Sequence, residues 1–139
     1  MKTIFKHPIL VLMVIGSLLS IAMKLPQDSE KTIIGKWKWV NLFNPETQDS
    51  LGLDLLTMGM AKEVFTEYKE DNTFIEYKNK LDKEGFSETK GEWKLEDNNS
   101  TLKLKPKEKW MSSKIIKLSA DTLIVEIRSP FQLLMVKQK

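Results

Sequence analysis

Short segments that alternate apolar and polar side chains run through residues 32–137 of this chain. In the first segment Trp37 and Trp39 share one face, while Lys36 and Lys38 lie on the other. Such period-two alternation is typical of a strand with one buried face. The same pattern predicts eight strands, at residues 32–40, 62–69, 73–80, 87–95, 101–105, 110–118, 122–128 and 131–137. Evenly spaced short strands favour an all-β fold, either an antiparallel up-and-down barrel or a sandwich.

Residues 41–61 interrupt this alternation and form the one long connection, between the first two predicted strands. Leu51, Leu55 and Met58 fall on one face of a short helix, although two glycines within the segment weaken it. A connection of this length in a compact barrel is usually a functional loop. We therefore expect a short helix or lid loop here, which either adapts to ligands or packs permanently across one end of the barrel.

The first 22 residues predict a targeting segment. Lys2 and Lys6 precede an apolar run at residues 9–23, and Ser20-Ile21-Ala22 offers small residues for signal-peptidase cleavage. The alternative is an uncleaved anchor in the inner membrane, although the run is shorter than the roughly 20 residues that span a bilayer. We expect residues 1–22 to be a signal peptide or anchor, 23–31 a tether and 32–139 one exported domain, periplasmic or secreted.

Composition excludes several classes of function. The chain has no cysteine, and its one histidine, His7, lies in the targeting segment. Triads that need histidine, histidine-ligated zinc and histidine-ligated haem are therefore excluded from the domain. Removing Lys2 and Lys6 lowers the formal charge from +3 to +1, so we expect no nucleic-acid partner. We expect no metal and no cofactor. We expect membrane association only through the N-terminal segment. The sequence does not indicate whether the protein is a monomer or an oligomer.

Several motifs, in order, resemble the small bacterial lipocalin-like domains. Gly35-Lys36-Trp37 resembles the Gly-x-Trp first strand of lipocalins, and residues 71–74 resemble a hairpin turn of the bacterial domains. Residues 90–95, with 101–104, resemble their later Gly-x-Trp strand and its partner, and residues 115–125 resemble a later hairpin. The resemblance covers most of residues 33–137. It implies an eight-stranded up-and-down barrel of the lipocalin type, with a cup for a small apolar ligand.

The resemblance also implies roles for individual residues. It places Gly35 and Trp37 at the closed end of the barrel, where lipocalins set an arginine of the last strand over the tryptophan. This chain has Lys137 in the corresponding strand instead. Residues 41–61 would supply the loop over the mouth of the cup, with Leu51, Leu55 and Met58 as the lid. The ligand would lie between Trp39, Phe74, Tyr77, Leu102 and Met135.

Three functions remain open at this stage. The first is an exported, non-enzymatic binding protein that holds a small apolar molecule in its barrel. The second is a solidly packed barrel of the cell envelope that binds a partner through its outer face or loops. The third is an enzyme that uses two carboxylates among Glu76, Glu92 and Glu126. In most barrels such mid-strand residues face water, so an enzyme is not expected.

Overall fold

The computed structural model describes residues 29–59, 61–80 and 84–139. The predicted signal segment and nearly all of the predicted tether lie outside the described residues. The described elements follow one another along the chain as α1 (Ser29–Ile33), β1 (Gly35–Asn44), β2 (Asp49–Ser50), α2 (Gly52–Thr57), β3 (Ala61–Tyr68), β4 (Thr73–Lys80), β5 (Phe86–Glu96), β6 (Thr101–Lys105), β7 (Met111–Leu118), β8 (Thr122–Arg128) and β9 (Phe131–Lys137). Across the described part of the chain, no helix combines the length and apolarity needed to cross a bilayer.

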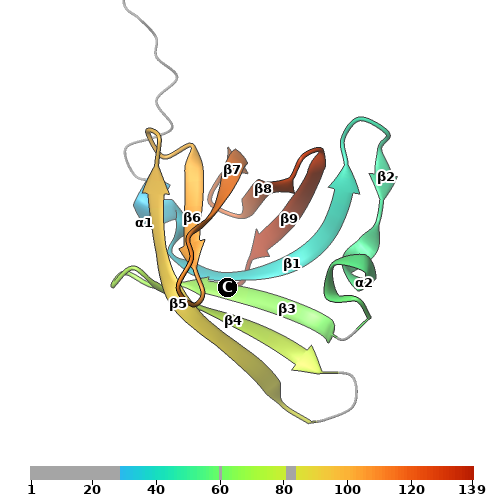
Figure 1. Ribbon diagram of the computed structural model, residues 1–139, viewed down its shortest axis with the longest axis horizontal. Helices are drawn as coiled ribbons and strands as arrows, with labels where there is room; N and C mark the ends of the chain where they lie inside the picture. Colours follow the sequence, from blue (N-terminus) through green and yellow to red (C-terminus); the bar gives the residue numbers. More distant parts are fainter. Residues whose placement is uncertain (1–28, 60, 81–83) are drawn as a thin grey trace, which may run out of the picture.

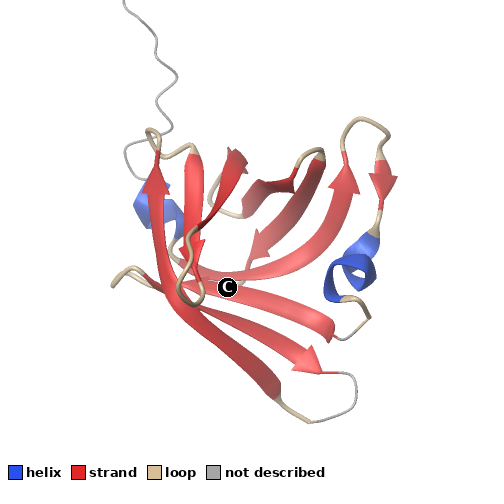
Figure 2. Cartoon of the chain, in the orientation of Figure 1, coloured by secondary structure: helices blue, strands red, loops and turns tan. Residues whose placement is uncertain are grey.

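The strands form one antiparallel barrel (Figures 1 and 2). From β3 to β9 each strand pairs with the next along the chain, and β1 pairs with both β3 and β9, which closes the barrel. The two-residue strand β2 pairs only with the far end of β1. The prediction of an all-β, eight-stranded up-and-down barrel with a short helix between its first two strands is therefore confirmed.

The turns between strands use residues that tolerate left-handed backbone conformations. Asn72, in the turn between β3 and β4, has a φ of 63°. Between β5 and β6, Asp97, Asn98 and Asn99 have φ values of 55°, 56° and 65°. Asparagine and aspartate adopt such conformations more readily than most residues, because their short polar side chains bond to the nearby backbone. The turn residues therefore lie where the alternation pattern predicts the short connections between strands.

The start of the first strand differs from the prediction. Thr32 and Ile33 belong to the helix α1, and β1 begins only at Gly35. Ser29 and Ile33 are both fully buried, so α1 packs into the barrel. Ile33 fits the alternation of a strand and also the inner face of a single helical turn. The sequence pattern therefore could not distinguish a strand from a helix at this residue.

The end of the first strand also differs, since β1 continues through residues 41–44, which were expected to start the loop. A β-bulge shifts the register against β9 between Trp39 and Asn41. Val40 is 45% exposed and Leu42 only 5% exposed. The successive inward residues here are therefore Trp39 and Leu42, which are three positions apart and not two. A bulge adds one residue and bends its strand, and this extra residue explains the loss of alternation. Figure 1 shows β1 curving strongly around the barrel.

The two helices of the described residues, α1 and α2, lie on opposite sides of the barrel (Figure 1). α2 packs against β1 and β3, and its Leu53 contacts the core. The core itself fills the inside of the barrel with the buried residues Ile33, Trp37, Tyr68, Phe74, Trp93, Leu102, Ile115, Leu123, Val125, Leu133 and Met135.

Candidate functional site

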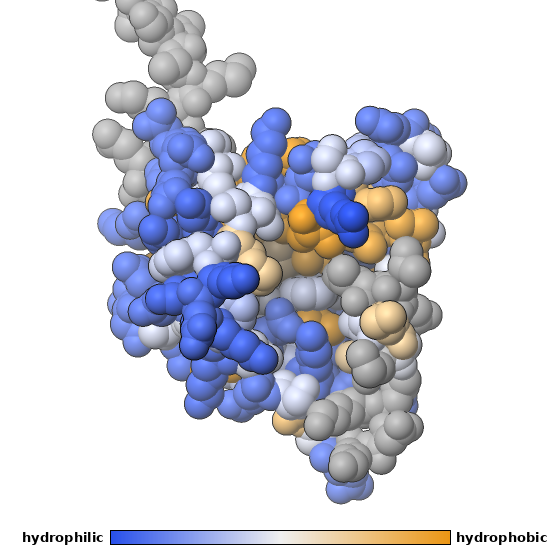
Figure 3. Space-filling model, viewed as in Figure 1, coloured by the Kyte–Doolittle hydropathy of each residue, from blue (hydrophilic) through white to orange (hydrophobic). Residues whose placement is uncertain are grey.

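A cavity of about 250 Å³ remains inside the barrel, beside this core. The described residues that line it come from seven strands and are mostly apolar: Trp39, Thr66, Tyr68, Glu76, Leu102, Leu104, Met111, Ser112, Ser113, Val125, Ile127, Leu133 and Met135. Met111 is 54% exposed and Ser112 is also exposed, so the cavity reaches solvent at the start of β7. Figure 3 shows apolar side chains gathered around a hollow near the middle of the face that it views.

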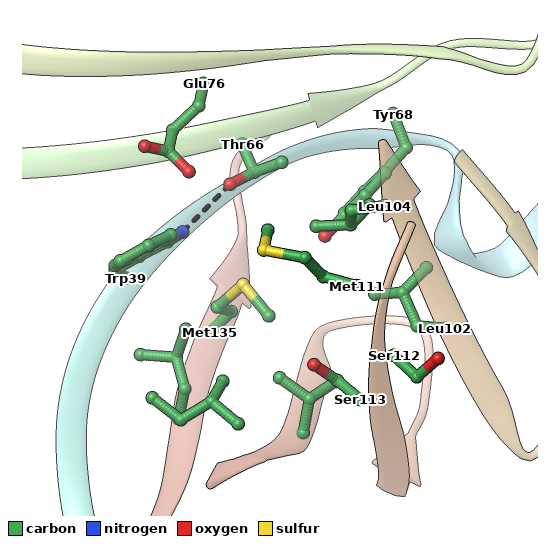
Figure 4. A pocket seen from close by; sticks show the side chains of 13 residues that line it. Trp39, Thr66, Tyr68, Glu76, Leu102, Leu104, Met111, Ser112, Ser113 and Met135 are labelled. Carbon is green, nitrogen blue, oxygen red and sulfur yellow. Dashed lines mark hydrogen bonds between the residues drawn. The ribbon is translucent and has the colours of Figure 1, made fainter. Parts of the chain in front are cut away.

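Strands β6 to β9 build the apolar wall of the cavity. Leu102 and Leu104 are alternate residues of β6, and Leu133 and Met135 are alternate residues of β9. Because successive side chains of a strand point to opposite faces, such spacing turns every second residue inward. In Figure 4 the side chains of Met111 and Met135 point toward one another across the cavity. Methionine is flexible and polarisable, so these two side chains can adapt to different occupants.

Strands β1, β3 and β4 supply a polar patch on the opposite wall (Figure 4). The indole nitrogen of Trp39 donates a hydrogen bond of 2.9 Å to the hydroxyl of Thr66. The Glu76 carboxylate lies nearby, 18% exposed, and forms a 2.9 Å ion pair with the ammonium group of Lys78. Burial raises the pKa of the Tyr68 hydroxyl above its usual value, and the negative charge of Glu76 raises it further. Tyr68 is therefore protonated at neutral pH and can donate a hydrogen bond.

The other end of the barrel is sealed. Trp37 is fully buried, and its indole nitrogen donates a 2.7 Å hydrogen bond to the carbonyl oxygen of Ile33 in α1. The ammonium group of Lys137 lies 5.0 Å from the centre of the Trp37 ring and donates a 2.7 Å hydrogen bond to the Thr32 carbonyl. Burial lowers the pKa of this lysine. Gly35 has a φ of +132°, and a Cβ atom there would lie 3.0 Å from Cε of Lys137, which explains the glycine.

Comparison with known proteins identifies the family of this barrel. A family model described as a lipocalin-like domain matches residues 33–125, which is well over half of the chain. The chain belongs to the lipocalin-like domain family. This confirms the resemblance that the motifs around Gly35 and Trp37 carry. No curated protein matches the chain.

Two solved structures share the fold of this lipocalin-like chain. A lipocalin-like protein from Bacteroides uniformis ATCC 8492 is 16% identical, with a TM-score of 0.58, and the match covers 77% of this chain and 99% of that one. An uncharacterized protein from Bacteroides eggerthii DSM 20697 is 12% identical, with a TM-score of 0.53 and coverage of 76% and 98%. At these identities the similarity establishes the fold alone.

The lipocalin-like barrel brings together three of the five residues predicted to bind the ligand. Trp39, Leu102 and Met135 line the cavity. Phe74 lies instead in the packed core, 2% exposed, and is not among the lining residues. Tyr77 lies on the outer face of β4, opposite Phe65, where its hydroxyl donates a 2.9 Å hydrogen bond to Glu67. Tyr77 follows the inward Glu76, so the alternation of the strand turns it outward.

Among the described residues, none of those that line the cavity comes from the predicted lid loop at 41–61. Leu51 is half-buried before α2. Met58 follows α2, with a φ of 53° and a side chain 82% exposed. The side chain of Leu55 lies outside the described residues. Instead, Met111 of β7 lies at the mouth of the cavity.

Besides Trp39, the polar patch contains Thr66, Tyr68 and Glu76, and sequence reasoning missed these three. The expectation that Glu76 faces water is not met, because it shares the inner face of β4 with Phe74 and its side chain is 18% exposed. The sequence did contain a signal for this, because Glu76 is two residues after the apolar Phe74 and should share its face of the strand. Of the described residues that line the cavity, Glu76 has the only carboxylate. No cluster of three or more acidic, histidine or cysteine side chains suited to a metal occurs within the described ranges.

Proposed function

We propose that this lipocalin-like barrel is a binding protein that holds a small apolar molecule in its interior. The observation that carries the proposal is the cavity of about 250 Å³ with its largely apolar wall. Transfer of apolar surface out of water would drive binding, since it contributes about 25 cal/mol for each Å² buried. The polar patch around Thr66 would orient the ligand, as a few placed polar groups do in most small-molecule sites.

The size of the cavity limits its occupant. An apolar cavity of about 150 Å³ accommodates benzene. In proportion, 250 Å³ holds about ten non-hydrogen atoms. The proposed ligand is therefore smaller than a long-chain lipid, unless part of it extends past Met111 into solvent.

The cavity favours this proposal over its two rivals. A solidly packed structural barrel would fill its interior with side chains, and an empty volume of this size argues against that reading. A carboxylate enzyme needs two acidic groups on either side of the reacting bond, whereas Glu76 is the one acidic residue among the described residues of the cavity wall. We therefore propose a non-enzymatic role.

Titration with naphthalene, a neutral hydrocarbon of about the size estimated above, tests the proposal. Methyl NMR spectra of the methionines would follow the titration, because Met111 and Met135 line the cavity. We expect their resonances to shift with a micromolar dissociation constant, which corresponds to about −8 kcal/mol.

Two variants of β7 make the test specific to the cavity. Ser113→Phe fills the interior and should abolish binding, since Ser113 lines the cavity. Lys114→Phe places the same ring at an exposed position one residue along and should bind as the wild type does. If naphthalene leaves the spectra of the wild-type protein unchanged up to its solubility limit, the barrel is a scaffold, and its outer face becomes the candidate surface.

We also propose that the protein is exported, on the strength of the basic start, apolar run and Ser20-Ile21-Ala22. N-terminal sequencing of the protein from envelope fractions should find Met23 first. An intact Met1 on a protein that needs detergent for extraction would favour the anchor.

A further inference from the structure

Tyr68 is a buried polar side chain without a partner. The residue is 2% exposed, and its ring packs edge-on against Trp93 at a centroid distance of 5.7 Å. Within the described part of the chain, its hydroxyl makes no hydrogen bond, whereas the indole nitrogen of Trp93 donates to the Lys69 carbonyl at 3.0 Å. A hydroxyl that is cut off from water and from any protein partner costs about 1–3 kcal/mol of stability, so the surroundings of the Tyr68 hydroxyl decide what it can bind.

The hydroxyl of Tyr68 opens onto the cavity. Among the described residues, no fully enclosed side-chain oxygen or nitrogen lacks a hydrogen-bond partner. Since the Tyr68 oxygen has none, it must keep some accessible surface. Tyr68 lines the cavity, and Figure 4 shows its side chain reaching inward from β3. The free donor is therefore presented to whatever fills the cavity.

The charge of the cavity wall restricts that occupant further. Glu76 is the one residue of the described lining that is charged at neutral pH, and no lysine or arginine belongs to the lining. Lys78 pairs with Oε1 of Glu76 at 2.9 Å, but its own side chain is 43% exposed, so solvent screens it. An anionic group drawn from water into this interior would meet the Glu76 charge without a facing cation.

We infer that the cavity selects an apolar molecule that carries a neutral hydroxyl group, over the same molecule with a carboxylate. The ligand hydroxyl would accept a hydrogen bond from Tyr68, which satisfies the unpartnered donor. The inference rests on the proposed function, since it concerns the occupant of the same cavity. It goes beyond that function because an apolar wall alone would favour the plain hydrocarbon. Such a wall would also bind a hydroxylated ligand equally well with or without the Tyr68 hydroxyl.

The test compares naphthalene, 2-naphthol and 2-naphthoate, which share one apolar body, at neutral pH. Tyr68→Phe should weaken binding of 2-naphthol about tenfold, the value of one hydrogen bond to a neutral group, and leave naphthalene unchanged. The wild-type protein should bind 2-naphthoate more weakly than 2-naphthol. Glu76→Gln should narrow that difference, because it removes the charge and keeps the shape of the side chain.

Tyr77→Phe is the matched control, because Tyr77 is the other tyrosine of the chain and its hydroxyl bonds to Glu67 on the outer face. It should change the affinity for none of the three compounds. Unchanged naphthalene binding by Tyr68→Phe also shows that the variant has kept its cavity.

The outcomes separate the two proposals. If naphthalene binds but Tyr68→Phe affects 2-naphthol and naphthalene equally, the hydroxyl inference is wrong and the binding function stands. If 2-naphthoate binds the wild-type protein most tightly, the inference is also wrong. If none of the three compounds binds, the proposed function fails and the inference fails with it.

Discussion

Trp37 and Trp39 occupy successive inward positions of β1, yet their surroundings differ. Trp37 is fully buried, held by the Ile33 carbonyl and covered by Lys137. Trp39 is half-buried, bonds to the side chain of Thr66 and lines the cavity. The barrel is thus packed at one end and hollow further along the same strand. Two residues on the same face of a strand can therefore have different roles, because the groups that cover each level of the barrel differ.

Truncation of the two tryptophans should separate these roles most clearly. Trp37→Ala should lower the free energy of unfolding by about 3–5 kcal/mol, the range for deleting a buried large aromatic side chain. Trp39→Ala should lower it by about 2 kcal/mol, as at a partly buried site, and should weaken naphthalene binding. Urea denaturation of both variants gives the comparison. Equal losses of stability would mean that the two ends are packed alike.

Replacement of Lys137 should weaken the sealed end by a smaller amount. Lys137→Met keeps much of the aliphatic chain but removes the charge over Trp37 and the hydrogen bond to the Thr32 carbonyl. We expect a loss of about 1–2 kcal/mol from these two contacts together. Lys139→Met, at an exposed position, is the control and should leave the denaturation midpoint unchanged. Naphthalene affinity should not change in either variant, because Lys137 does not line the cavity.

Alkaline pH should destabilise the fold through Tyr68. The folded-state pKa of Tyr68 lies above the unfolded value of 10.0, so above pH 10 the unfolded chain releases a proton that the folded chain keeps. Stability should therefore fall as pH rises, by about 1.4 kcal/mol for each pH unit above the unfolded pKa. Tyr68→Phe should lose less stability than the wild type over the same range.

A second tyrosine complicates the alkaline experiment. Burial, with the hydrogen bond to Glu67, raises the pKa of Tyr77 to about 12. Since the chain has two tyrosines, the absorbance of tyrosinate in Tyr77→Phe reports Tyr68 alone. Titration of Tyr68 near its ordinary value in that variant would show that its hydroxyl is solvated and would contradict the buried placement.

The barrel could be predicted from local sequence patterns alone. Alternation around Trp37, Trp93 and Leu104, with turns at Asn72 and at Asp97, located all eight barrel strands to within a few residues, except at the two ends of β1. These signals are local: period two follows from strand geometry, and the turns follow from residues that tolerate positive φ. The same local pattern could not separate the helix α1 from a strand at Ile33, nor reveal the bulge at Val40.

Local patterns could not predict which inward residues meet the cavity, because that depends on packing between strands. Phe74 and Glu76 share the inner face of β4, but Phe74 packs into the core and Glu76 reaches the hollow. The polar patch joins residues from three strands, and Met111 comes to the mouth from β7. Strand alternation gives each side chain a face but not a depth. Depth depends on how the barrel closes and on which end α1 and Lys137 seal.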